Sequence, residues 1–367
     1  MYGIIKVRCQ YGTICGANLT APYILRSGSR IQDIEILRVL AVFGVIYCHN
    51  VFHVIDTEQL YLNSKIVYGI YNVLYVISYT AVPLFFMISG CLLMEKEESL
   101  EMILKKRVFR MVIVLVLFTF TFYLITIDDD FSKFSIGAYF ARLFGEGVHS
   151  YWYLYAYIML MLGLPFLRAI GKQIKENPEL IQYLIVMKVI MSVVIPIIEA
   201  FSGVTAHASL AFPYVGDSIF YFLMGYYFGK LHATTGKECA RWLLASFGAF
   251  LLEFILIYAL PDQRESLYRI GIFAVTFAIY TGVKWLTEHI FIPNLMVKVV
   301  CWIGAVSFPM YLIENVVAGK IRTYMYPFLN GYMHGVVAFL IYLNMTVFIE
   351  AVIGTCMKKI PVMKHLL

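Results

Sequence analysis

Charged side chains are scarce in this sequence. Only 14% of the 367 residues are Asp, Glu, Lys or Arg, whereas 61% are hydrophobic and 16% are aromatic. Soluble domains are about a quarter charged and about half apolar. The longest polar gap between apolar runs is about 20 residues, which is too short for a domain with its own core. The sequence therefore predicts no soluble domain, and we do not take its net charge of +6 as a sign of nucleic-acid binding.

Patterned cysteines are absent as well. The seven cysteines are scattered, and no two of them form a C-x-x-C pair. This spacing predicts neither disulfide bonds nor a metal site. The first 30 residues are mixed and basic and show no cleavable signal pattern. No segment repeats at a fixed period.

The sequence does contain a succession of apolar runs long enough to cross a bilayer. We predict an all-α fold, a polytopic membrane helical bundle of about ten transmembrane helices. The predicted spans are residues 36–55, 68–94, 108–127, 152–167, 182–201, 211–229, 242–260, 269–287, 298–318 and 332–355.

Lysine and arginine are distributed unevenly between the two sides of these spans. Alternate connecting segments carry a roughly threefold excess of them, which predicts that both termini are cytoplasmic. On this topology residues 1–30 form an N-terminal cytoplasmic segment, residues 31–357 the transmembrane domain and residues 358–367 a cytoplasmic tail. Such a chain is expected in a bacterial plasma membrane, as a multi-pass protein surrounded by lipid.

The first predicted span carries an arginine near its start and a histidine eleven residues later, Arg38 and His49. Eleven residues are about three helical turns and about 16 Å, so both side chains lie on nearly one stripe of the helix. Arg38 is expected at the cytoplasmic border, paired with Glu35 three residues before it. His49 is expected in the outer half of the membrane, where an ionisable side chain is more often functional than not.

Four segments, taken in order, resemble the integral-membrane acyltransferase 3 family. They are the Arg38–His49 spacing, F-F-M-I-S-G at residues 85–90, K-R-V-F-R at 106–110 and H-S-Y-W-Y-L-Y at 149–155. The resemblance covers about residues 31–355. The chain departs from many members near the end of this range, where it reads Y-L-I-E at 311–314 and they read Y-L-I-H.

The resemblance implies an O-acetyltransferase activity. An acyl group, usually acetyl from acetyl-CoA, would pass to a hydroxyl of an extracytoplasmic glycan or cell-envelope sugar. It also implies that His49 is the catalytic histidine with Arg38 as its companion, and that Arg107 and Arg110 form a cytoplasmic arginine pair. Guanidinium groups suit phosphates, so we expect these arginines to bind CoA. A thioester is an activated donor, so no metal is expected.

Several further residues have two interpretations. Glu314 and Glu199 lie at the predicted depth of His49, and either could orient its imidazole. His149 and Trp152 could contact the acceptor sugar or belong to an interfacial aromatic belt. The arginines could be topology anchors, and Ser89 and Gly90 could serve only close helix packing.

Two other functions remain open from the sequence. An exporter of polysaccharide or lipid-linked intermediates would also be polytopic, although exporters more often show internal repeats and broken helices. A non-catalytic membrane sensor is the third possibility, and it predicts that His49 tolerates replacement by alanine.

Overall fold

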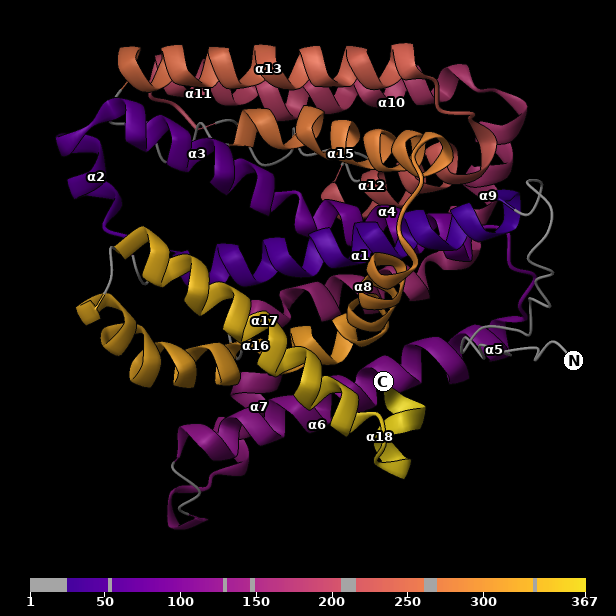
Figure 1. Cartoon of the computed structure of the whole chain (residues 1–367). Coiled ribbons are helices and arrows are strands. Elements are labelled where there is room, and N and C mark those ends of the chain that lie inside the picture. The colour runs from indigo at the N-terminus through magenta and orange to yellow at the C-terminus, as the bar shows by residue number, and fades with distance from the viewer. Residues whose placement is uncertain are drawn as a thin grey trace, which may run out of the picture.

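The structure is a computed structural model that describes residues 25–51, 55–127, 131–145, 149–205, 216–260, 269–332 and 335–367. Every regular element in these ranges is a helix, which confirms the predicted all-α class (Figure 1). The α-helices are α1 (Leu25–Val51), α2 (Thr57–Asn63), α3 (Lys65–Tyr79), α4 (Ala81–Leu93), α5 (Leu100–Ile103), α6 (Phe109–Thr126), α7 (Ile136–Phe144), α8 (Trp152–Leu162), α9 (Leu164–Glu176), α10 (Glu179–Val189), α11 (Ile195–Ser202), α12 (Asp217–Tyr226), α13 (Gly236–Ala259), α15 (Arg269–His289), α16 (Asn294–Tyr332), α17 (Gly335–Met357) and α18 (Pro361–Leu366).

Short π-helical and 3₁₀ segments join or interrupt these helices. The π-helical segments are η1 (Leu104–Val108), η4 (Ile190–Val194) and η7 (Tyr227–Leu231), and the 3₁₀ segments are η2 (Phe131–Lys133) and η3 (His149–Tyr151). Both η1 and η4 lie inside longer helical stretches, so they change the direction in which the following side chains point.

Eight helical stretches in the described ranges are long and apolar enough to cross a membrane. This finding supports the predicted polytopic bundle. Two predicted spans differ from the structure in shape. Residues 152–176 form two helices, α8 and α9, bent by 69° at Gly163. Pro165 has no amide hydrogen to donate to the carbonyl of Met161 four residues earlier, and its ring would clash with that carbonyl in a continuous helix, which explains the break.

The helix that contains predicted span 298–318 is much longer than expected. α16 runs on to Tyr332 and has 39 residues, about 58 Å of helix, with Pro309 and Pro327 inside it. Predicted span 211–229 lies partly outside the described residues, and its described part is the short helix α12 followed by η7.

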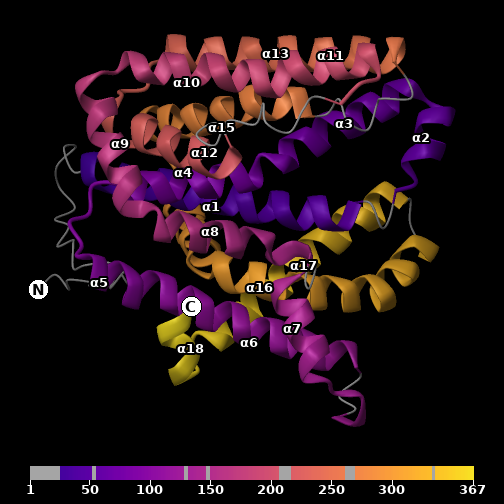
Figure 2. The ribbon, with the colours of Figure 1, turned by 180° about the vertical axis from the view of Figure 1, so that it is seen from behind.

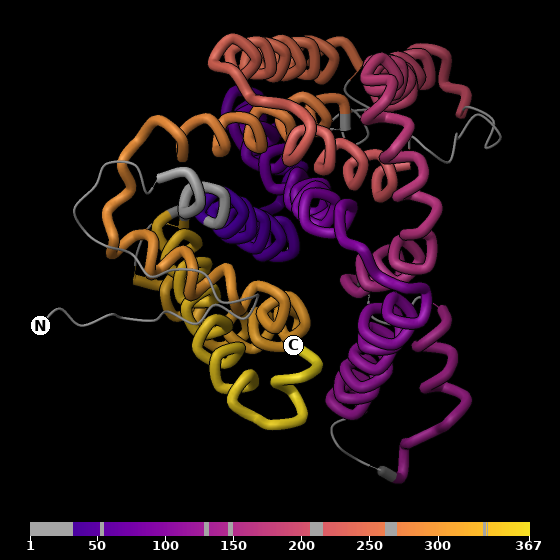
Figure 3. The backbone as a smooth tube through the Cα atoms, turned by 90° about the vertical axis from the view of Figure 1, so that its right-hand side faces the viewer, coloured from indigo at the N-terminus to yellow at the C-terminus, as the bar shows by residue number. Residues whose placement is uncertain are grey.

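α1 occupies the middle of the molecule. It packs against α3, α4, α15, α16 and α17. Figure 3 shows α1, in indigo, between the purple α4 and the orange-to-yellow α16 and α17. α10, α11 and α13 lie along one edge, and α6 and α7 lie along the opposite edge (Figures 1 and 2). The helix predicted to carry the key residues is therefore the one that the others surround.

α4 and α12 approach each other at two glycines. A Cβ atom on Gly90 would lie 1.8 Å from the carbonyl oxygen of Phe222, and one on Gly225 would lie 1.9 Å from that of Met87. The backbones of α4 and α12 are therefore in direct contact, which small residues such as glycine permit between membrane helices. The structure therefore supports close helix packing as the role of Gly90.

Candidate functional site

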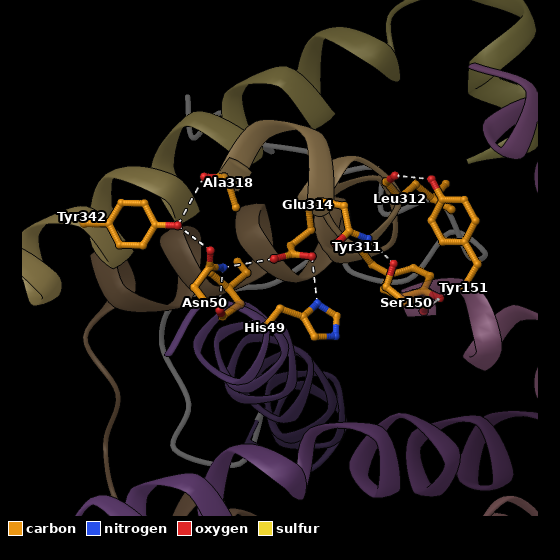
Figure 4. Close-up of polar contacts among 11 residues, drawn as sticks. His49, Asn50, Ser150, Tyr151, Tyr311, Leu312, Glu314, Ala318 and Tyr342 are labelled. Atoms are coloured by element: carbon orange, nitrogen blue, oxygen red, sulfur yellow. Dashed lines mark hydrogen bonds and ion pairs between the residues drawn. The ribbon is translucent and has the colours of Figure 1, made fainter. Parts of the chain in front are cut away.

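His49 lies near the C-terminal end of α1 and faces α16. Its Nδ1 atom is 2.8 Å from Oε2 of Glu314 (Figure 4). The Glu314 side chain is only 2% exposed, whereas the histidine side chain is 30% exposed. The residues come from helices far apart in sequence, and only the packing of α16 on α1 brings them together.

Asn50 and Tyr342 complete a polar cluster that we call the His49 network: His49, Asn50, Glu314 and Tyr342. The Asn50 amide donates to Oε1 of Glu314 at 3.1 Å and to the carbonyl of Ile46 at 2.8 Å. The Tyr342 hydroxyl, from α17, donates to Oδ1 of Asn50 and lies 3.3 Å from the carbonyl oxygen of Ala318. Both carboxylate oxygens of Glu314 thus have partners, as a buried charge requires.

This arrangement fixes the chemistry available to the imidazole. If Glu314 is a carboxylate it can only accept, so Nδ1 of His49 carries the hydrogen. The Nε2 atom then holds a lone pair, and Figure 4 shows it pointing away from Glu314. No residue in the described ranges hydrogen-bonds to Nε2, so a neutral His49 can take a proton there, as the base of a histidine–carboxylate pair does.

Two crossed hydrogen bonds tie the start of α8 to α16 beside this network. The Tyr151 hydroxyl donates to the carbonyl of Leu312 at 2.7 Å, and the Tyr311 hydroxyl donates to that of Ser150 at 2.6 Å (Figure 4). The Asn315 amide donates to the Ser150 hydroxyl. These contacts fix the part of α16 from which Glu314 projects.

The two residues predicted to contact the acceptor sugar, His149 and Trp152, lie on either side of Ser150 and Tyr151, which make these hydrogen bonds. The backbone of His149 is next to Ser150 in η3, but its side chain lies outside what the structure describes. Trp152 begins α8 and is 48% exposed. Its position suits either an interfacial ring or a contact with an incoming substrate.

Arg38 lies toward the other end of α1 and pairs with Glu35. Its Nη1 atom is 2.5 Å from Oε1 of Glu35, which confirms the pairing predicted from their spacing. The Glu35 carboxylate packs against α16 so closely that a Cβ atom on Gly304 would lie 2.1 Å from its Oε2. Arg38 is half-buried and close enough to Tyr153 of α8 to interact with it electrostatically.

Arg107 and Arg110 have different neighbours. Arg107 lies in η1 and donates to both carboxylate oxygens of Glu98, at 3.0 and 2.5 Å. Arg168, from α9, donates to the same carboxylate at 2.9 Å. The two hydrogen bonds from Arg107, and then the one from Arg168, hold the pKa of Glu98 below its usual range. Arg110 lies in the first turn of α6, and its buried Nε atom donates to no described residue.

The sequence indicated Glu35 beside Arg38 and offered Glu314 as one of two partners for His49, but it did not indicate the other members of these clusters. Asn50 and Tyr342 in the network, and Glu98 and Arg168 around Arg107, were not among the predicted site residues. The only feature of the sequence that could have indicated them is position. Asn50 directly follows His49, and Arg168 lies three residues after Pro165, where the helix is broken. Within the described ranges, no three His, Cys, Asp or Glu side chains come close enough together to hold a metal ion.

Comparison with known proteins gives one match. A family model described as an acyltransferase domain matches residues 31–355, most of the chain. No curated protein and no solved structure matches. The matched range contains α1 with Arg38 and His49, the arginines of η1 and α6, and the helices that carry Glu314 and Tyr342. The chain belongs to the acyltransferase 3 family.

Proposed function

We propose that this membrane acyltransferase moves an acetyl group from cytosolic acetyl-CoA to a hydroxyl of an extracytoplasmic glycan or cell-envelope sugar. The family supplies the acyl-transfer activity. The donor, the acceptor and the roles of individual residues are our inference. The observation that carries the proposal is the contact between His49 and Glu314, with Nε2 of His49 left available.

In the proposed reaction, Nε2 of His49 takes the proton of the acceptor hydroxyl. The hydroxyl oxygen attacks the thioester carbonyl, a C–O bond forms and the C–S bond breaks. The departing CoA thiolate then receives the proton from His49. Glu314 holds the ring in the tautomer with hydrogen on Nδ1 and stabilises the imidazolium that forms. Asn50 holds Glu314 in place, and the Tyr342 hydroxyl holds Asn50.

The arginines suit the donor. Arg38, Arg107 and Arg110 are at the end of the bundle predicted to be cytoplasmic, where the phosphates of CoA arrive. Arg38 and His49 are separated by about 16 Å along one helix, on the order of the length of a pantetheine arm. We infer that the arm extends along α1 and presents the thioester at Nε2. The acceptor would approach from the opposite side, near His149 and Trp152.

The exporter is the less favoured alternative. A permeation path has no need for a histidine whose tautomer is fixed by a buried carboxylate. The family match also concerns acyl transfer.

The test is acetyl transfer in inverted membrane vesicles. Radiolabelled acetyl-CoA is supplied outside the vesicles, and label in lumenal glycan is measured for wild type, H49A and the control H289A. His289 is exposed and hydrogen-bonds only locally, to the carbonyl of Trp285. We expect label with wild type and H289A but not with H49A. Equal label with all three would remove His49 from the chemistry. No label with any of them, together with lost glycan export in cells that lack the protein, would favour the exporter.

A further inference from the structure

Lys358, just after α17, satisfies a carbonyl group that a proline frees in α16. Pro309 has no amide hydrogen and cannot donate to the carbonyl of Ala305 four residues earlier. The Nζ atom of Lys358 donates to that carbonyl at 2.7 Å. This contact fixes the ammonium group against α16 and leaves two of its hydrogens for other acceptors.

The ammonium group lies among charges from two other helices. Arg38 and Glu35 of α1 and Arg110 of α6 are its electrostatic neighbours. Burial, and then the charges of Arg38 and Arg110, lower the pKa of Lys358 below its ordinary value. Three cationic side chains therefore share this region with one carboxylate, Glu35, which Arg38 already uses.

The last residues of the chain hold Lys358 in this position. α18 packs against α6, and Met363, Leu366 and Leu367 lie against the hydrophobic core. The segment predicted as a cytoplasmic tail is therefore docked on the bundle, where α18 lies beside α6 in Figures 1 and 2. α6 also carries Arg110, which is an electrostatic neighbour of Lys358 and whose buried Nε has no described acceptor.

Arg107 differs from Arg38, Arg110 and Lys358 in how far its donors are already used. Two of its nitrogen atoms are bonded to Glu98, and Arg168 shares the same carboxylate. An anion at Arg107 would have to compete with Glu98. An anion among Arg38, Arg110 and Lys358 would instead relieve the repulsion between like charges.

We propose that Arg38, Arg110 and Lys358 form the site for the phosphate groups of the acyl-CoA donor, with Lys358 as a binding residue outside the family-matched range. The inference rests on the proposed function, because it assumes that the donor is a CoA thioester. It replaces Arg107, which the family resemblance groups with Arg110, by Lys358, and it assigns Arg107 to organising the 94–99 loop through Glu98. Guanidinium groups can each bind a phosphate with two hydrogen bonds, and the lysine adds a point charge.

The test measures binding of coenzyme A to the purified full-length protein by titration calorimetry. The variants are K358M, K358R and the control K359M, whose lysine is the exposed neighbour. We expect K358M to weaken binding about tenfold, the size of one lost charge-assisted hydrogen bond. K358R should stay close to wild type because it keeps the charge, and K359M should bind as wild type does.

The dependence of affinity on salt separates phosphate binding from a purely structural role. One fewer charge contact makes affinity less sensitive to ionic strength, so the salt dependence should be shallower for K358M than for wild type. Wild-type affinity in K358M, or weaker binding with unchanged salt dependence, would overturn the assignment of Lys358 and leave the donor proposal intact. Failure of wild type to bind coenzyme A would overturn the proposed donor, and this site with it.

Discussion

The imidazole of His49 and the carboxylate of Glu314 meet at 2.8 Å although 265 positions separate them in the chain. Glu314 is the residue at which the sequence departs from the Y-L-I-H pattern expected from the family resemblance. In the structure this acid is buried and accepts a hydrogen bond from the ring of His49. This pairing makes Glu314 the most direct target for mutation.

Replacing Glu314 with Gln should lower the acetyl-transfer rate by up to roughly 10⁴-fold, the loss seen when the Asp of a Ser-His-Asp triad becomes Asn. The amide can donate to Nδ1 of His49 and so favour the wrong tautomer. The vesicle assay at saturating acetyl-CoA measures the rate. E314D, which keeps the acid, should retain more activity than E314Q. Wild-type rates in E314Q would show that Glu314 does not control the histidine.

Replacing Tyr342 with Phe should reduce activity less than E314Q does. The variant loses the hydroxyl that holds Oδ1 of Asn50, and a buried acceptor left unpaired costs about 1–3 kcal/mol. The melting temperature in detergent and the vesicle rate are the measurements. Y324F is the matched control, since Tyr324 is 73% exposed. A Y342F protein as stable and active as Y324F would contradict the role of Tyr342 in the network.

The Glu98 cluster should make stability depend on pH. The pKa of Glu98 is lowered on folding, first by Arg107. Its contribution to the free energy of unfolding is therefore fully present above the unfolded pKa, about 4.3, and is lost as pH falls through the lower folded value. E98Q should melt below wild type at pH 7, and the difference should shrink as pH falls below about 4.

Melting curves from pH 3 to 7 test this prediction. E101Q is the control because the ion pair of Glu101 with Lys105 is largely exposed and contributes little. A difference between wild type and E98Q that stays constant over this range would show that Glu98 stabilises the fold without its charge.

Replacing Gly90 with Ala should prevent normal packing of α4 on α12. The added methyl group would meet the Phe222 carbonyl, which is backbone and cannot rotate away. We expect destabilisation of several kcal/mol, in the range that marks severe overpacking. The yield of monodisperse protein and its melting temperature are the readouts. G248A is the control, because a Cβ atom on Gly248 meets nothing within 4 Å. Equal stability of the two variants would contradict the close approach.

The sequence predicted those parts of the site that depend on one helix. The helical repeat placed Arg38 and His49 on one stripe and paired Glu35 with Arg38, and α1 has these features. The choice between Glu199 and Glu314 was open because both lie at a similar predicted depth. Depth along the membrane says nothing about which helix packs beside α1, so the partner of His49 required the tertiary structure.

Breaks and extensions of helices were also hard to predict. Hydropathy detects an apolar run, but it does not detect the 69° bend at Gly163 or the extra length of α16. Pro165 was visible in the sequence, yet Pro309 lies inside α16 without ending it. At Pro309 the freed carbonyl of Ala305 accepts a hydrogen bond from Lys358, a tertiary contact that hydropathy cannot detect.

Both carboxylate oxygens of Glu314 are hydrogen-bonded to residues of α1. The His49–Glu314 pair therefore exists only while α16 is packed on α1. A bundle in which these helices have not yet met would contain a histidine free to adopt either tautomer and an unpaired acid in an apolar setting. On the proposed mechanism, assembly of the bundle and competence for acyl transfer are therefore one event. A chain in which α16 has not yet packed on α1 would lack the pair that activates the acceptor hydroxyl.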